Sequence, residues 1–178
     1  MQRWAFFLLW LVAASAAVAD ERRGQVLFLR HALAPGAGDP PEMRLDDCTT
    51  QRNLSAEGRD QARALGRRLR AAGIGAARVL TSQWCRCRET AVLLGFDEPV
   101  EMTALNSFFQ DRTHEQDYRE ALAVFLEELS PDGPPVILVT DYVTIQAMTG
   151  QRPASGAGVW MRRSAVGGWE PAGKVAAP

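Results

Sequence analysis

Three places in the chain carry side chains that could bind and transfer a phosphoryl group. Arg30 and His31 directly follow the apolar run Val26–Leu29, Arg86 lies a few residues beyond a second apolar stretch, and Asp141 ends a third. Two guanidinium groups beside one imidazole can hold the oxygens of a phosphate. Their positive charge also disfavours protonation of the imidazole, which would keep His31 neutral and nucleophilic.

The elements around these residues are predicted to bring them together. Apolar runs of strand length alternate with segments of helical spacing. We expect strands over residues 25–30, 78–82, 100–103 and 136–140, helices over 55–72, 83–95, 116–129 and 142–149, and terminal strands over 156–162 and 168–175. This order predicts an α/β fold, a three-layer sandwich with a mostly parallel central sheet flanked by helices. Parallel strands end at one edge of the sheet, so Arg30, His31, Arg86 and Asp141 should surround one crevice.

Two of these places lie within longer motifs, and a third motif stands between them. Leu29-Arg30-His31-Ala32 is similar to the Arg-His-Gly motif of the histidine phosphatase superfamily, which includes phosphoglycerate mutases and acid phosphatases, with alanine in the glycine position. Residues 54–62 resemble the start of that family's first helix, where a Leu-Ser pair precedes a glycine and then a Gln-Ala pair. Residues 82–91 resemble its Ser-Pro-Leu-x-Arg-x-x-x-Thr-Ala element, with glutamine and tryptophan in place of proline and leucine. The resemblance extends from about residue 26 to residue 150.

The resemblance implies a phosphohistidine mechanism without a metal or another cofactor. His31 would attack the phosphorus, Arg30 and Arg86 would hold the phosphoryl oxygens, and water would then release phosphate. Arg52 and Asn53, which follow the long loop, are further candidates for phosphate contacts, although a role at the start of the next helix explains them equally well. Asp111, on a loop with two phenylalanines, is the candidate for the acid that protonates the leaving group, ahead of Glu89.

Asp141 departs from the family pattern, which has a second catalytic histidine at the end of this strand. A carboxylate there would repel an incoming phosphate and would favour the protonated, non-nucleophilic form of His31. It could also pair with Arg30 or Arg86 and occupy the phosphate site itself. Alternatively, Asp141 could be protonated when phosphate is bound and donate a hydrogen bond, as the histidine would. We therefore expect Asp141 to affect turnover more than it affects the fold or phosphate binding.

Residues 32–52 form a predicted loop rich in proline, glycine and acidic side chains, and loops of this length in compact domains tend to be functional. Cys48 lies within it. In an oxidising compartment Cys48 could form a disulfide with Cys85 or with Cys87, and one thiol would remain free. A metal site is the rival interpretation, but the three cysteines lack a clear fourth ligand.

The first 19 residues have the pattern of a secretory signal peptide: a basic start, an uncharged apolar stretch and Ala17-Val18-Ala19 before Asp20. An uncleaved anchor helix is the alternative, but the apolar run is short for a full membrane span. We expect cleavage after Ala19, no stable membrane span afterwards, and a single domain over residues 20–178 that is periplasmic or secreted. A net charge of -1 argues against a general nucleic-acid binder.

These observations leave three functional hypotheses. The first is an exported phosphomonoesterase that acts on a phosphorylated small molecule or an envelope substrate, with activity reduced by Asp141. The second is an inactive relative that binds a phosphorylated ligand or a partner. The third is a disulfide-stapled structural protein of the cell envelope, in which Arg30 and His31 only terminate a core strand.

Overall fold

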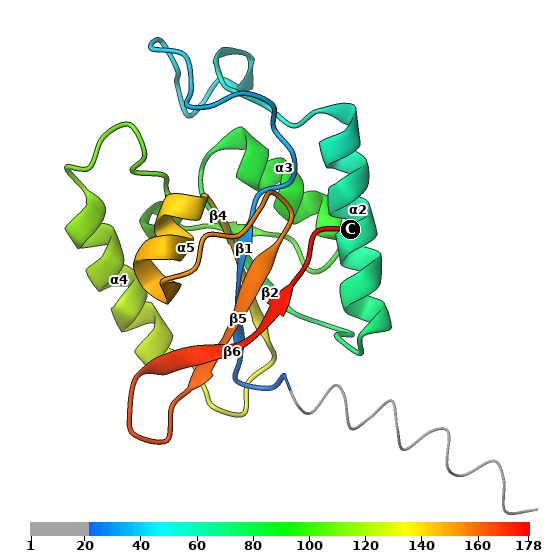
Figure 1. Ribbon diagram of the computed structural model, residues 1–178, viewed down its shortest axis with the longest axis vertical. Helices are drawn as coiled ribbons and strands as arrows, with labels where there is room; N and C mark the ends of the chain where they lie inside the picture. The colour runs from blue at the N-terminus through cyan, green and yellow to red at the C-terminus, as the bar shows by residue number, and fades with distance from the viewer. Residues whose placement is uncertain (1–21) are drawn as a thin grey trace, which may run out of the picture.

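The computed structural model describes residues 22–178, which contain a six-stranded sheet in the order β3-β2-β4-β1-β5-β6 (Figure 1). The strands are β1 (Val26–Arg30), β2 (Arg78–Thr81), β3 (Val100–Glu101), β4 (Val136–Thr140), β5 (Gly158–Arg163) and β6 (Trp169–Val175). Parallel pairing joins β1 to β4, β4 to β2 and β2 to β3. The terminal strands β5 and β6 are antiparallel, and β5 pairs with β1. The expected sheet, parallel in its centre, is confirmed.

The register of the central pair determines which side chains meet at the edge of the sheet. Arg30, the last residue of β1, lies opposite Thr140, the last residue of β4. The backbone N–H of His31 donates to the carbonyl of Thr140 at 3.0 Å, so the two strands stay paired to their ends. His31 and Asp141 directly follow these two strands and therefore lie side by side.

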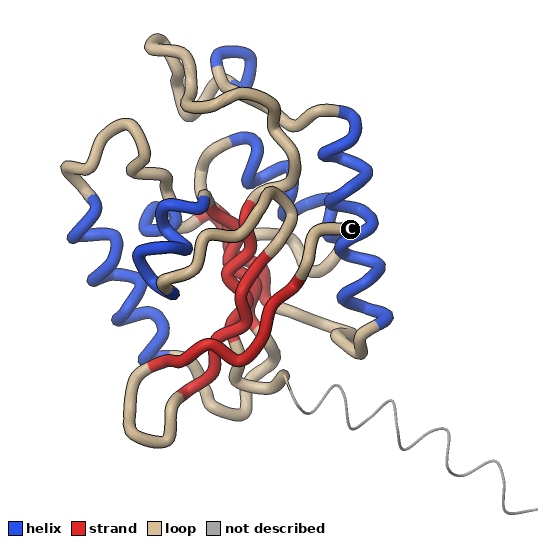
Figure 2. Tube along the Cα trace, in the orientation of Figure 1, coloured by secondary structure: helices blue, strands red, loops and turns tan. Residues whose placement is uncertain are grey.

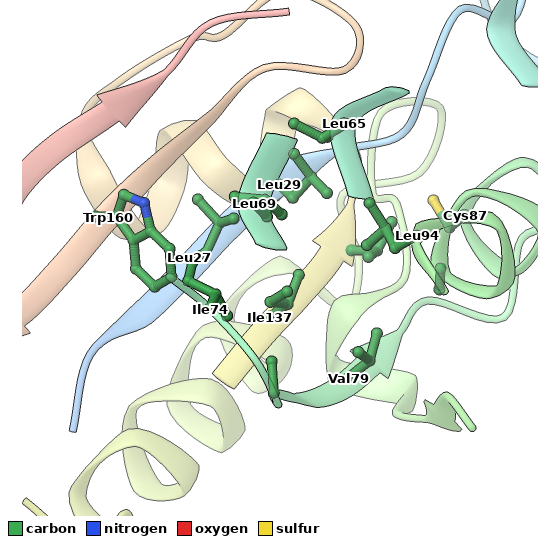
Figure 3. Close-up of a cluster of buried hydrophobic side chains, with 13 residues drawn as sticks. Leu27, Leu29, Leu65, Leu69, Ile74, Val79, Cys87, Leu94, Ile137 and Trp160 are labelled. Carbon is green, nitrogen blue, oxygen red and sulfur yellow. The ribbon is translucent and has the colours of Figure 1, made fainter. Parts of the chain in front are cut away.

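Helices cover both faces of the sheet, as the alternation of the sequence predicts (Figures 1 and 2). On one face, α2 (Ala56–Ala71) and α3 (Cys85–Leu94) pack against Leu27 and Leu29 of β1 in the cluster of Figure 3. On the other face, α4 (Glu115–Glu128) and α5 (Tyr142–Thr149) pack with Val26 and Phe28. Each fully buried side chain of this size contributes about 1.5–3 kcal/mol to stability. The three-layer sandwich is therefore confirmed.

The predicted strand over residues 100–103 is too long at its carboxyl end. Only Val100 and Glu101 form β3, and the chain then turns into the short 3-10 helix η2, Thr103–Leu105. Leu105 is fully buried, and its carbonyl accepts a hydrogen bond from the hydroxyl of Thr140 at 2.5 Å. The need to bury Leu105 beneath the sheet edge explains why the strand stops early.

The predicted signal peptide, residues 1–19, lies outside the described residues. The cleavage site and the exported location therefore stay predictions. Within residues 22–178, none of the helices is long and apolar enough to cross a membrane.

Candidate active site

A cavity of about 530 Å³ lies at the carboxyl ends of the parallel strands, beside the loop that follows β1. Its walls combine guanidinium groups, carboxylates and aromatic rings. The charged side chains that line it include Arg30, Arg52, Arg86, Arg152, Asp39, Asp111 and Asp141. Of the residues predicted to meet in one crevice, Arg30, Arg86 and Asp141 line this cavity, and His31 lies directly behind Asp141.

Both ring nitrogens of His31, which is fully buried, have hydrogen-bond partners. Nδ1 lies 2.7 Å from the carbonyl oxygen of Ala32, and Nε2 lies 3.0 Å from Oδ1 of Asp141. A carbonyl only accepts, so Nδ1 carries a proton. If Asp141 is ionised, Nε2 must also carry a proton, and His31 is then an imidazolium without a lone pair for attack.

Asp141 is ionised in this environment. Burial alone would raise the pKa of its carboxyl group, but the hydrogen bond from His31 and the charge of Arg86 outweigh burial and hold that pKa well below its usual range. The Nη2 group of Arg86 donates to Oδ2 of Asp141 at 2.6 Å. The carboxylate of Asp141 thus binds both the candidate nucleophile and the candidate phosphate ligand.

Arg86 is held by a second carboxylate, which sequence reasoning did not single out. Its Nη1 group lies 2.9 Å and 3.0 Å from the two oxygens of Asp39. Burial opposes the charge of Arg86, but its carboxylate neighbours, Asp141 first, raise the pKa of the guanidinium group. The only sequence signal for Asp39 was its place in the long proline-rich and glycine-rich loop.

The other guanidinium groups of the cavity have no such partner. Among the described residues, no carboxylate forms an ion pair with Arg30, Arg52 or Arg152. Arg52 donates to the carbonyls of Gly38 at 2.8 Å and Ala34 at 2.5 Å, and burial lowers the pKa of both Arg30 and Arg52. Three positive charges therefore face the cavity with no negative charge paired to them.

Tyr142 holds two of these arginines from the start of α5. The guanidinium of Arg152 lies 4.1 Å from the centre of its ring, and that of Arg30 lies 5.2 Å from it. Stacking on an aromatic face orients a guanidinium group while leaving its edge free to donate hydrogen bonds. Sequence reasoning missed Arg152 because it follows α5 in a loop, outside any motif.

The motif residues that lack a chemical role hold the site together. The hydroxyl of Thr90 accepts from the backbone N–H of Ala32 at 3.0 Å and donates to the carbonyl of Arg86 at 2.7 Å, so it joins the segments after β1 and β2. Gln61 accepts from the backbone N–H of Leu33 at 2.9 Å. The hydroxyl of Ser55 caps α2 by accepting from the backbone N–H of Gly58 at 3.0 Å.

The structure does not support the roles predicted for Asn53, Asp111 and Glu89. Asn53 points into its own loop, where its side chain donates to the carbonyl of Cys48 at 2.6 Å, and it does not line the cavity. Asp111 does line the cavity, but hydrogen bonds from Thr113 lower the pKa of this exposed carboxyl group, the wrong direction for a proton donor. Glu89 forms an ion pair with Arg59 instead.

Cys48 and Cys85 form a disulfide, one of the two pairings that the sequence left open. It ties the loop after β1 to the first residue of α3, next to Arg86. Cys87 is free and buried, and burial raises the pKa of its thiol to about 12, so it is unreactive at neutral pH. Among residues 22–178, no group of three or more histidine, cysteine, aspartate or glutamate side chains is placed to hold a metal ion.

Solved structures share this fold over most of its length. The protein histidine phosphatase SixA, in complex with tungstate, is 18% identical, with a TM-score of 0.57 over 85% of this chain and 96% of that chain. A mycobacterial hydrolase is 17% identical, with a TM-score of 0.63 over 88% and 99% of the two chains. A mycobacterial glucosyl-3-phosphoglycerate phosphatase is 15% identical, with a TM-score of 0.61 over 88% and 100%. At these identities the likeness concerns the fold.

A comparison with curated proteins finds no match. The sequence model of the histidine phosphatase superfamily (branch 1) matches residues 26–147. This segment is more than half of the chain, and it contains Arg30, His31, Arg86 and Asp141. The chain therefore belongs to the histidine phosphatase superfamily.

Proposed function

We propose that the protein is an exported phosphomonoesterase that acts through a phosphohistidine at His31 and is restrained by Asp141. The observation that carries this proposal is the convergence of four guanidinium groups at a single cavity, with the imidazole of His31 directly behind Asp141. Among the described residues, three of these four guanidinium groups have no carboxylate partner. A phosphate monoester dianion complements such a cluster. The fold and motifs of the histidine phosphatase superfamily support the same chemistry.

Two buried donors also favour an anionic ligand. The Nε groups of Arg30 and Arg86 are buried, and neither has a hydrogen-bond partner among the described residues. Folded proteins rarely leave such donors unsatisfied. A phosphoryl group bound in this cavity would bring acceptor oxygens to both side chains. SixA, a protein of this fold, is described in complex with tungstate, a tetrahedral oxyanion that resembles phosphate in shape.

The reaction requires Nε2 of His31 as the nucleophile. Its lone pair would form a bond to phosphorus while the bond from phosphorus to the leaving oxygen breaks, and that oxygen takes up a proton. Arg30 and Arg86 would neutralise the charge on the phosphoryl oxygens in the transition state. Water would then attack the phosphohistidine, releasing phosphate and restoring His31.

Asp141 opposes the first step in three ways. It keeps a proton on Nε2, it occupies Nη2 of Arg86, and its charge repels the incoming phosphate. Turnover therefore requires Asp141 to leave His31 or to take up a proton. This geometry also favours a second candidate function, in which the protein binds a phosphorylated ligand without hydrolysing it.

Export is part of the proposal and has two supports. The first 19 residues have the composition of a secretory signal peptide. The disulfide between Cys48 and Cys85 is typical of proteins that fold in an oxidising compartment. A phosphorylated small molecule or an envelope component is the substrate class that such a location would offer.

Hydrolysis of an aryl phosphate by the purified protein tests the proposal, with His31→Ala and Asp141→His as variants. We expect slow hydrolysis that His31→Ala abolishes and that Asp141→His raises by about 100-fold or more, the usual contribution of a well-placed acid–base group. Hydrolysis that survives His31→Ala would refute the assignment of the nucleophile. No hydrolysis by the wild-type protein, with strong hydrolysis by Asp141→His, would favour the binding function.

A further inference from the structure

We propose that Asp39 is an internal competitor of the phosphoryl group, so that the loop after β1 sets which anions can bind at Arg86. This inference rests on the proposed function, because it takes Arg86 as a ligand of phosphate. Asp39 belongs to none of the motifs, and its side chain, 3% exposed, reaches the floor of the cavity from the loop. Asp39 thus brings a carboxylate from a loop, and not from a strand end, onto Arg86, a proposed phosphate ligand.

The carboxylate of Asp39 accepts hydrogen bonds from three directions. Nη1 of Arg86 approaches both of its oxygens, at 2.9 Å and 3.0 Å. The indole N–H of Trp84 donates to Oδ2 at 3.0 Å, and the backbone N–H of Arg52 donates to Oδ1 at 3.1 Å. One guanidinium edge, one indole and one amide around a single anion form the kind of donor set that holds a phosphoryl group. The carboxylate therefore occupies an oxyanion site that the chain has already built.

The loop that carries Asp39 is also held by Gln110, another residue that lines the cavity. The side chain of Gln110 accepts from the backbone N–H of Asp39 at 2.9 Å and donates to its carbonyl at 3.1 Å. Gly38 adopts a positive φ of 68°, a conformation that glycine allows and that turns the chain just before Asp39. Both contacts of Gln110 are exposed, so they can exchange with water at little cost. The backbone at Asp39 is thus held on the Gln110 side by exposed contacts that a ligand can replace, while Arg52 holds the preceding residues through the carbonyls of Gly38 and Ala34.

The competition has a consequence for ligand choice. Arg86 already has a carboxylate on each of its two terminal nitrogens, so a monoanion would gain little by replacing one of them. A dianion brings a second negative charge, which Arg30, Arg52 and Arg152 can receive, since none of them has a carboxylate partner in the described part of the chain. Asp39 should therefore exclude monoanions, such as carboxylates and phosphodiesters, and admit phosphate monoesters.

The matched control is the other loop carboxylate of the cavity. Asp111 also lines the wall, but its side chain contacts Thr113 and, within residues 22–178, no arginine. The substitutions Asp39→Asn and Asp111→Asn each remove one negative charge from the same cavity. A general change of electrostatic potential would therefore act in both variants, whereas release of Arg86 occurs only in Asp39→Asn.

Binding of inorganic phosphate and of acetate to the purified proteins, measured by isothermal titration calorimetry, tests the inference. We expect Asp39→Asn to bind phosphate at least about tenfold more tightly than the wild type, and Asp111→Asn to change the affinity less than about threefold. Asp39→Asn should also bind acetate, which the wild type excludes. Gln110→Ala, which loosens the loop without changing charge, should raise phosphate affinity by a smaller factor and serves if Asp39→Asn does not fold.

Equal changes in phosphate affinity in Asp39→Asn and Asp111→Asn would overturn the inference, because they would show only a general change in the electrostatic potential of the cavity. Weaker phosphate binding by Asp39→Asn would also overturn it and would make Asp39 a residue that positions Arg86. Unchanged affinity in every variant, including an absence of phosphate binding, contradicts it as well. The proposed function is tested separately, by hydrolysis with Asp141→His. Tighter phosphate binding by Asp39→Asn, with no hydrolysis in any variant, would refute the proposed function and support this inference.

Discussion

The disulfide between Cys48 and Cys85 yields a quantitative prediction. It closes a loop with a sequence separation of 37 residues, which includes α2 and β2. The double substitution Cys48→Ser with Cys85→Ser removes this constraint from the unfolded chain, while the buried thiol of Cys87 stays unchanged. The folded loop keeps the hydrogen bond from the backbone N–H of Cys85 to the side chain of Gln51, at 2.9 Å, so the native backbone should survive.

The magnitude follows from the length of the closed loop. In the chain-entropy model, a closed loop with a sequence separation of 37 residues lowers the entropy of the unfolded state by about 13 cal/mol/K. At 25 °C this corresponds to about 4 kcal/mol of stability. Small native domains have only about 5–15 kcal/mol in total, so the variant should be markedly less stable.

Urea unfolding followed by circular dichroism would measure the difference. The wild type should lose about 4 kcal/mol when a reductant is added, and the double variant should already lack this amount and should not respond to the reductant. A loss below about 1 kcal/mol in the double variant would refute the reasoning. If the reductant also lowered the stability of the double variant, its effect on the wild type could not be assigned to this disulfide.

Two further predictions concern packing and acid. A Cβ atom at Gly66 in α2 would lie 2.0 Å from the carbonyl oxygen of Leu94, whereas one at Gly75 would meet nothing within 4 Å. In urea unfolding, Gly66→Ala should therefore lower the free energy of unfolding by at least about 3 kcal/mol, and Gly75→Ala by less than about 1 kcal/mol. Equal costs would contradict the close approach of α2 to α3. Because the folded pKa of Asp141 lies below the unfolded value of about 3.9, its stabilisation is complete above about pH 5 and is lost as the pH falls below about 4. The wild type should therefore lose more stability than Asp141→Asn between pH 5 and about pH 2, and parallel curves would contradict the low folded pKa.

The fold was predictable because its central strands are continuous apolar runs that alternate with helical segments along the sequence. The runs around Phe28 and Leu138 are apolar throughout, which is typical of strands covered on both sides, and they form β1 and β4 at the centre of the sheet. The order of strands and helices then limited the topology to a parallel core. The one clear error, the length of β3, lies at an edge where pairing is short and Leu105 turns inward.

The centre of the site was predictable for the same reason, since the ends of parallel strands meet. Pairing of Asp141 with Arg30 or Arg86 was one of the alternatives that the sequence left open, and Asp141 binds Arg86 at 2.6 Å. Asp39 and Arg152 could not be located, because loops without periodicity or motif give no sign of which side chain returns to the sheet edge. Their positions depend on tertiary contacts, with Trp84 for Asp39 and with Tyr142 for Arg152.

A direct test of the central claim is to trap the phosphohistidine in Asp141→His. Brief reaction with a phosphate monoester, followed by an alkaline quench and mass spectrometry, would locate a phosphoryl group bound to nitrogen, which is stable in base and labile in acid. The claim predicts this group on His31 in Asp141→His, much less of it in the wild type, and none when His31→Ala is added. A phosphoryl group on another residue, or equal amounts in the wild type and in Asp141→His, would contradict the claim that Asp141 restrains a nucleophilic His31.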